Sequence, residues 1–202
     1  MTERKVQILM GSDSDAPTMQ RTVDLLKEFN ISCHMTVASA HRSPGRVEKL
    51  IKDAPENGVK VFVVGAGAAA HLAGVVAAHS TLPVIGVPID SSPLKGWDAL
   101  LATVQMPPGV PVATVSVGNA GATNAAVLAA QILALTDEGV AAAVKNYKEK
   151  LAAKVEQAAA KVECNYCVLL HGVFGLFLLI LRFLAYFRRT LSLPVGKVCK
   201  SP

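Results

Sequence analysis

Cysteine is scarce in the first 160 residues of this sequence, where Cys33 is the only one of the chain's 4 cysteines. A single cysteine is typical of a protein from a reducing compartment, where thiols stay unpaired. The N-terminus also lacks the apolar stretch and small-residue cleavage site of an export signal, because it enters a short apolar run at Val6. Both absences favour a cytoplasmic location.

Charged residues are also few, at 17% of the chain, whereas apolar residues make up 51%. This balance excludes a disordered chain and favours either a heavily buried oligomer or a membrane segment. Residues 1–160 hold 14 basic and 14 acidic side chains, so the formal charge of +5 comes entirely from residues 161–202. A basic surface for nucleic acid is therefore absent from the main part of the chain, and we expect no nucleic-acid partner.

The composition changes after Lys161, because 4 of the 6 phenylalanines and 3 of the 4 cysteines fall beyond it. Residues 167–187 are nearly all apolar, and their number approaches the roughly 20 residues that span a bilayer. Two interpretations stay open, a membrane-associated segment and an extension foreign to the domain. The Cys164-x-x-Cys167 pair is weak support for a metal, since a second ligand pair is missing. We predict a folded domain over residues 1–161 and an atypical apolar and basic tail over residues 162–202.

Five short apolar runs rich in β-branched residues are typical of buried parallel strands. They are Val6–Met10, Cys33–Val37, Val61–Val64, Val84–Val87 and Val112–Val117. The segments between them repeat apolar residues at the i, i+3, i+4 and i+7 spacing of a helix. Alternating strands and helices with right-handed crossovers predict one α/β domain, a three-layer flavodoxin-like α/β/α sandwich around a parallel sheet.

Helix starts support this interpretation. Asp15 and Ser43 are capping residues, and each precedes a proline in the first turn of a predicted helix. A long alanine-rich helix is expected from about Asp137 to Lys161, and Trp97 is expected to pack. The apolar stripe of the long helix, which we expect to pack on the domain or on a neighbouring subunit, includes Val140, Val144, Leu151 and Val155.

The residues that directly follow the apolar runs carry the functional signal, because open parallel sheets bind ligands beyond the carboxyl ends of their strands. The first run is followed by Gly11-Ser12-Asp13-Ser14-Asp15. Hydroxyls and free amides at a helix start suit an anion, and Asp15 is a good acceptor for ribose hydroxyls. The alternative is a turn and helix cap without a ligand.

The second run leads into Ser39-Ala40-His41-Arg42-Ser43-Pro44. An imidazole that exchanges protons near neutral pH stands here beside a fixed cation that can hold a phosphate. An ordinary surface or core histidine is the alternative for His41, but the adjacent arginine at a strand end favours a site.

The third run leads into Gly65-Ala66-Gly67-Ala68-Ala69-Ala70-His71. Small residues let a backbone approach a ligand closely, and His71 is the only polar side chain in this stretch. A tight turn with a buried histidine is the alternative. The pattern is not a dinucleotide fingerprint, because Ala70 stands where G-x-G-x-x-G requires glycine. Packing explains the small residues of 118–124 about as well as binding does.

Taken together, the blocks MGSDSD, SAHRSP, GAGAAAHLAG and VQMPPGVPVATVSVGNAG resemble, in this order, the class I 5-(carboxyamino)imidazole ribonucleotide mutases over roughly residues 5–160. The resemblance implies a nucleotide-binding isomerase of de novo purine (IMP) biosynthesis. It also implies a homo-octamer of flavodoxin-like subunits that uses no metal and no organic cofactor. The implied reaction converts 5-(carboxyamino)imidazole ribonucleotide into its 4-carboxylate isomer.

The resemblance also implies roles for individual residues. His41 is expected to be the general acid/base, and His71 is expected to support the carboxyl group. The remaining expected substrate contacts are Ser12, Asp15 and Arg42 for the ribonucleotide, Ser14 and Ser39 for its phosphate, and the backbone of Gly67, Ala68 and Ala69 for the carboxyl group.

Two positions depart from the family pattern, since Ala68 and Ala73 stand where glycine and proline are usual. Two other functions stay open. Direct carboxylation of aminoimidazole ribonucleotide is one, although that class commonly has lysine after the histidine where this chain has Arg42. The other is a non-catalytic nucleotide-binding module, since a fold alone does not determine function.

Overall fold

The computed structural model describes residues 4–163 of the chain. Its elements follow one another as β1 (Val6–Met10), the 3-10 helix η1 (Asp13–Asp15), α1 (Ala16–Glu28), β2 (Cys33–Val37), α2 (Pro44–Asp53), β3 (Val61–Gly67), α3 (Leu72–His79), β4 (Val84–Ile89), α4 (Trp97–Val104), β5 (Ala113–Thr114) and α5 (Gly118–Leu133). A further helix covers residues 138–163. The Cys164–Cys167 pair and the apolar segment 167–187 lie outside the described residues. Within 4–163, no helix combines the length and apolar character needed to cross a membrane.

The strands form one parallel sheet in the order β2-β1-β3-β4-β5. The chain adds β2 on one side of β1 and then places β3 on the other side, which creates a switch point between β1 and β3. This order is that of flavodoxin-like folds, so the predicted fold class is confirmed.

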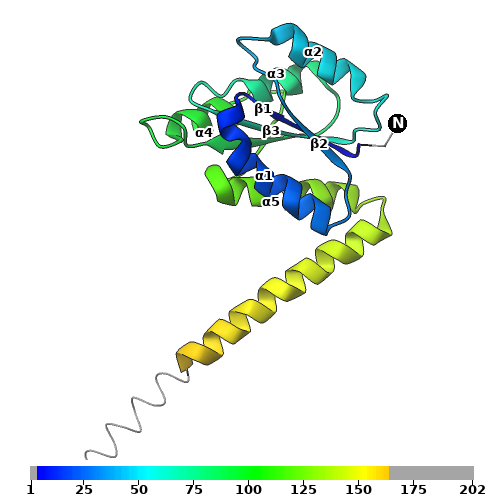
Figure 1. Ribbon diagram of the computed structural model, residues 1–202, viewed down its shortest axis with the longest axis vertical. Helices are drawn as coiled ribbons and strands as arrows, with labels where there is room; N and C mark the ends of the chain where they lie inside the picture. The colour runs from blue at the N-terminus through cyan, green and yellow to red at the C-terminus, as the bar shows by residue number, and fades with distance from the viewer. Residues whose placement is uncertain (1–3, 164–202) are drawn as a thin grey trace, which may run out of the picture. The chain divides into compact units, whose positions relative to one another are not determined.

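Helices cover both faces of the sheet, with α1 and α5 on one face and α2 and α3 on the other (Figure 1). Each buried strand supplies both layers, because its side chains alternate between the two faces. Along β3, Val61 and Val63 pack toward α1 and α5, whereas Phe62 and Val64 pack in the core with α2 and α3. Such two-sided burial explains why the strands read as continuous apolar runs.

The predicted strands differ from the observed ones mainly at their carboxyl ends. β3 runs on to Gly67 and β4 to Ile89, because these residues still pair with each other in register. β5 was predicted as Val112–Val117 but pairs with β4 only at Ala113 and Thr114. The chain then turns directly into α5, where Gly118 adopts a left-handed φ of 70°.

The predicted caps lie in the right places but do not bond as expected. Asp15 and Ser43 are the N-cap residues of α1 and α2, with proline in the first turn, yet neither side chain makes the capping hydrogen bond. The Asp15 carboxylate accepts instead from the amide of Ser12, and the Ser43 hydroxyl accepts from the amide of Ser39. Both side chains therefore bond to the loops that precede the helices instead of capping the helices.

The helix over residues 138–163 begins in the compact unit Met1–Tyr147, and a second unit begins at Lys148. Val140 and Val144 are buried in the core beside α1 and α5, as predicted. In the single chain Leu151 and Val155 are exposed. Trp97 was expected to pack and is instead 66% exposed, because α4 turns it away from the core that buries Ala99.

Candidate active site

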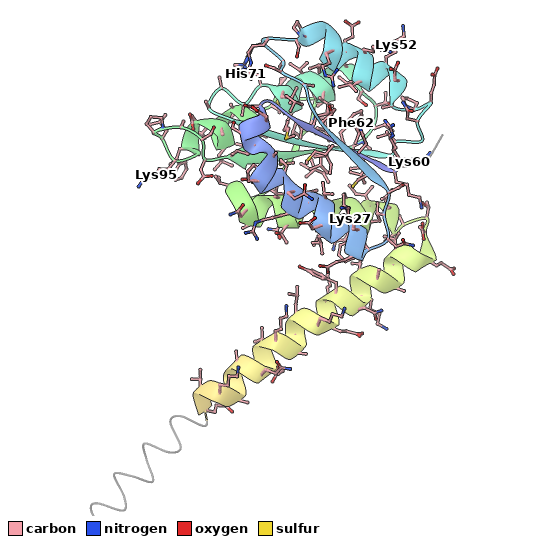
Figure 2. The ribbon with its side chains drawn as sticks, in the orientation of Figure 1. Lys27, Lys52, Lys60, Phe62, His71 and Lys95 are labelled. Atoms are coloured by element: carbon pink, nitrogen blue, oxygen red, sulfur yellow. The ribbon has the colours of Figure 1, made fainter. Side chains whose placement is uncertain are left out.

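The site is a cavity of about 400 Å³ beyond the carboxyl ends of the strands, at the switch point of the sheet. Figure 2 shows Lys60, which precedes β3, and Lys95, which follows β4, at opposite ends of the strands. The two residues mark the amino ends and the carboxyl ends of the strands, respectively. The lining residues are Gly11, Ser12, Ser14, Asp15, Ser39, Ala40, His41, Arg42, Ala66, Gly67, Ala69, Leu72 and Ser91. The segments that follow β1, β2, β3 and β4, which are distant in sequence, thus line one cavity.

The loop after β1 is held by a reciprocal capping box. The Ser12 hydroxyl accepts from the amide of Ser14 at 3.3 Å, and the Asp15 carboxylate accepts from the amide of Ser12 at 3.0 Å. Burial raises the pKa of Asp15 above its ordinary value and outweighs the hydrogen bond from Ser12, which lowers it. The carboxyl group is therefore fixed in place and partly deprived of water, as a ligand-binding acceptor should be.

Arg42 ties the loop after β2 to the loop after β1. Its Nη2 donates to the carbonyl of Gly11 at 2.8 Å, and its Nε donates to the Ser39 hydroxyl at 3.4 Å. None of the carboxylates in residues 4–163 forms an ion pair with Arg42. Its guanidinium carries further N–H donors, so this oriented cation can hold an anionic ligand.

His41 and His71 form a hydrogen-bonded pair, although 30 residues separate them in the chain. The Nε2 of His41 lies 2.9 Å from the Nδ1 of His71, and the two rings meet edge to face. One ring nitrogen must donate the shared proton while the other accepts it, so the contact couples their tautomers. A proton that His41 gains or loses at the cavity therefore affects the His71 ring.

The end of β3 and the loop after it line the cavity through Gly67 and Ala69. The amides of Ala70 and His71 donate within the loop, to the carbonyls of Ala68 and Ala69, both at 2.8 Å. Nothing in the described chain accepts from the amides of Ala68 and Ala69. Two neighbouring free amides just before the N-terminus of α3 suit a carboxylate or another oxyanion.

Eight of the ten predicted site residues line the cavity: Ser12, Ser14, Asp15, Ser39, His41, Arg42, Gly67 and Ala69. His71 and Ala68 do not line it, although His71 is hydrogen-bonded to the lining residue His41 and Ala68 lies between the lining residues Gly67 and Ala69. Ser91 lines the cavity but was not predicted, because it follows the fourth apolar run in a stretch without histidine, arginine or clustered glycine. Its position directly after a strand was the only sequence signal for it.

Metal ligands do not gather in this part of the molecule. Across residues 4–163 there is no group of three or more His, Cys, Asp or Glu side chains arranged to hold a metal ion. The polar groups of the cavity are an arginine, a buried carboxyl group, hydroxyls, backbone amides and the histidine pair. They can bind an anion and a sugar, and they can exchange a proton.

The fold and the cavity together define a class, the flavodoxin-like α/β proteins with an acid–base site at the switch point. The family model described as AIR carboxylase matches residues 5–154. The chain belongs to this family.

Curated relatives and solved structures agree with that assignment. The N5-carboxyaminoimidazole ribonucleotide mutase of Thermotoga maritima is 48% identical over 159 residues, which cover 79% of this chain and 92% of the relative. The Bacillus subtilis protein of the same name is 52% identical over 144 residues, covering 71% and 89%. The crystal structure of Treponema denticola PurE superposes with a TM-score of 0.70 at 32% identity, covering 77% of this chain and 96% of that one.

Proposed function

We propose that this protein is an N5-carboxyaminoimidazole ribonucleotide mutase of purine biosynthesis, which moves a carboxyl group from the exocyclic nitrogen of the substrate to its ring carbon. The observation that carries the proposal is a cavity lined both by His41, which is hydrogen-bonded to His71, and by Arg42, which forms no ion pair within residues 4–163. Relatives that carry this name are 46–52% identical to the chain.

The cavity divides the substrate between its loops. Arg42 and the hydroxyls of Ser12, Ser14 and Ser39 suit the phosphate, because an arginine fork and hydroxyl donors complement its oxygens. The buried carboxylate of Asp15 suits the ribose hydroxyls. The imidazole end then faces the loop after β3, where the amides of Ala68 and Ala69 are free for the carboxyl group.

In the proposed reaction His41 gives up one proton and later takes one back, so no net proton is consumed. His41 gives a proton to the exocyclic nitrogen as the carbon–nitrogen bond breaks and carbon dioxide leaves. The ring carbon then attacks the trapped carbon dioxide, and His41 takes the proton that this carbon loses. His71 holds the other end of the shared hydrogen bond and keeps the His41 ring in position through both transfers.

Replacing His41 with asparagine tests this assignment. Asparagine preserves much of the shape and one donor but cannot carry the proton, so we expect turnover to fall about 100- to 10,000-fold. The affinity for the ribonucleotide should stay within a few-fold, because Arg42 and Asp15 remain. Calorimetric binding and a spectrophotometric rate assay measure the two effects separately. Retained turnover in His41→Asn would contradict the proposed mechanism.

Direct carboxylation of aminoimidazole ribonucleotide is the second candidate, since the family model is described as AIR carboxylase. The two are distinguished by supplying purified protein with either the carboxyamino nucleotide or the decarboxylated nucleotide plus bicarbonate. The mutase proposal requires consumption of the first. Consumption of the second alone would establish the carboxylase. A protein that binds both without turnover would be a binding module.

We further propose a cytoplasmic homo-oligomer, an octamer in the family resemblance, with residues 1–161 as the catalytic domain. An exposed apolar stripe on and beside α4, formed by Leu94, Trp97, Leu101 and Val104, supports the oligomer. Expression of residues 1–161 beside the full chain tests the domain. Equal specific activity would show that residues 162–202 are dispensable for catalysis, and loss of activity would place part of the catalytic domain beyond residue 161.

A further inference from the structure

Ser91 and Gly67 meet at the end of the cavity formed by β3 and β4. A Cβ atom added to Gly67 would lie only 1.8 Å from the Ser91 hydroxyl oxygen and 3.1 Å from the carbonyl of Ile89. A side chain at position 67 would therefore force the Ser91 hydroxyl to move from this position. Gly67 pairs with Ile89 at the end of β4, and Ser91, two residues further along the chain, lines the cavity.

The Ser91 hydroxyl has no structural role that would explain its position. Among residues 4–163 it neither donates nor accepts a hydrogen bond. The next residue, Ser92, differs in this respect, because its hydroxyl accepts from the amide of Leu94 at 3.1 Å and its carbonyl accepts from the amide of Lys95. Ser92 thus shapes the loop, whereas Ser91 offers an unused donor and acceptor to the cavity.

The place of Ser91 in the cavity indicates its ligand. Arg42 and the serines near it follow β1 and β2, on one side of the switch point, whereas Gly67 ends β3 and Ser91 follows β4, on the other side. A nucleotide whose phosphate lies by Arg42 directs its base toward Gly67. Within the described chain, Ser91 is the one side-chain hydroxyl that lines that side of the cavity, where it lies against Gly67.

We propose that Ser91 donates a hydrogen bond to the carboxyl group that is transferred. The same hydroxyl helps to hold the carbon dioxide in the cavity after the group has left nitrogen and before it bonds to the ring carbon. This inference rests on the proposed mutase function and adds a substrate contact to it. The hydroxyl proton stays on Ser91 throughout, so the residue binds and orients the carboxyl group while His41 moves the protons.

Ser91→Ala tests the contact, and Ser92→Ala is its matched control from the same loop. A hydrogen bond to a charged group is worth enough that we expect Ser91→Ala to slow interconversion by roughly tenfold to a hundredfold. Affinity for aminoimidazole ribonucleotide, which lacks the carboxyl group, should stay unchanged within a factor of about two. Ser92→Ala should leave the rate within a few-fold of the wild-type rate. An equal loss in both variants would assign the effect to loop shape and overturn the proposal.

Escape of carbon dioxide gives a second readout that loop disturbance alone does not predict. With labelled bicarbonate in solution, Ser91→Ala should incorporate more label into the product per turnover than the wild type does, because the trapped molecule leaves more often. Unchanged interconversion and unchanged labelling in Ser91→Ala would overturn the inference while the mutase function stands. Absence of interconversion by the wild-type protein would overturn the proposed function itself.

Gly67→Ala completes a double-mutant cycle. Alone it should reduce the rate at least as much as Ser91→Ala, because its methyl group displaces the hydroxyl. In the Ser91→Ala background the same methyl should cost clearly less, since the closest contact has been removed. Purely additive losses would show that the two residues act independently and would contradict a shared carboxyl site.

Discussion

At the scale of single residues, Asp15 combines a proposed binding role with a cost in stability. Burial raises the pKa of its carboxyl group above the ordinary value of 3.8, despite the hydrogen bond from Ser12 and the charge of Arg42. The folded state therefore binds the proton more tightly than the unfolded state does, and stability falls as the pH rises through this range. At neutral pH the ionised carboxylate destabilises the fold.

We accordingly expect Asp15→Asn to increase the free energy of unfolding at pH 7 and to weaken ribonucleotide binding by about tenfold. The gain should disappear as the pH falls below about 3.8, where both states of the wild-type protein are protonated. Urea unfolding at several pH values and calorimetric binding measure both effects. The exposed Asp24 of α1 serves as control, because its replacement with asparagine should change stability by less than about 0.5 kcal/mol. A constant difference at all pH values would contradict the burial argument.

Ala68 is a second residue where the site strains the chain, since it adopts a left-handed φ of 50°. Left-handed backbone costs an L-residue roughly 1–2 kcal/mol, and glycine avoids this penalty. We expect Ala68→Gly to raise the free energy of unfolding by up to about 1 kcal/mol. Ala69→Gly in the same loop should lower it by about 0.5–1 kcal/mol, because Ala69 has no positive φ to relieve. Chemical denaturation at one protein concentration compares them, and a gain in both variants would contradict the prediction.

Much of the candidate site was predictable from sequence because ligands bind at strand ends, and His41 and Arg42 lie in the loop that follows β2. The pairing of His41 with His71 was not, because it joins residues 30 positions apart through loop geometry. Ser91 was missed for a related reason. Its place in the cavity depends on the pairing of β3 with β4, which brings it against Gly67, and a local sequence pattern does not predict this contact.

At the scale of elements, the start of α5 lies very close to the loop from β5. A Cβ atom on Gly121 would fall 1.7 Å from the carbonyl oxygen of Ser116, a backbone atom that cannot rotate aside. We expect Gly121→Ala to destabilise the protein by about 3 kcal/mol or more through this overpacking. Gly45→Ala in α2 is the matched control, because its Cβ would meet nothing within 4 Å.

Gly45→Ala should stabilise α2 by up to about 1 kcal/mol, since alanine favours the helical backbone. Thermal unfolding of the two variants should therefore shift in opposite directions from the wild type. Similar shifts would mean that α5 adjusts its position and that the contact with Ser116 is not restrictive.

Element positions were predictable where burial sets the pattern. β1 and β2 have the predicted bounds, because each begins and ends with its apolar run. The errors lie where another element decides the end of a strand. β3 and β4 extend each other by pairing Gly67 with Ile89, and α5 draws the chain away from β5 after Thr114. The ends of these strands are therefore set by contacts between elements that are distant in sequence.

At the scale of the whole molecule, the flavodoxin-like sheet follows from alternating strands and helices, but the surface of α4 does not. Leu94, Trp97 and Leu101 are 61%, 66% and 51% exposed, and Val104 continues the same stripe at 49%. The spacing of Trp97, Leu101 and Val104 places these three on one face of α4, and Leu94 lies in the turn that precedes the helix. An apolar face of this kind is typical of a protein–protein interface, and a second copy of the chain is the partner that the proposed oligomer supplies.

We therefore expect Leu101→Glu to weaken self-association by at least about tenfold, because the interface would bury an unpaired charge. Sedimentation velocity over a range of protein concentrations should show smaller species for this variant than for the wild type. Leu135→Glu is the matched control, since Leu135 is 84% exposed but lies outside the α4 stripe. The control should sediment as the wild type does. If both variants keep the wild-type assembly, the α4 stripe is not the interface. If both variants dissociate, the loss reflects the added charge and not the position of Leu101. Only an interface at the α4 stripe predicts that two otherwise equal substitutions have different effects.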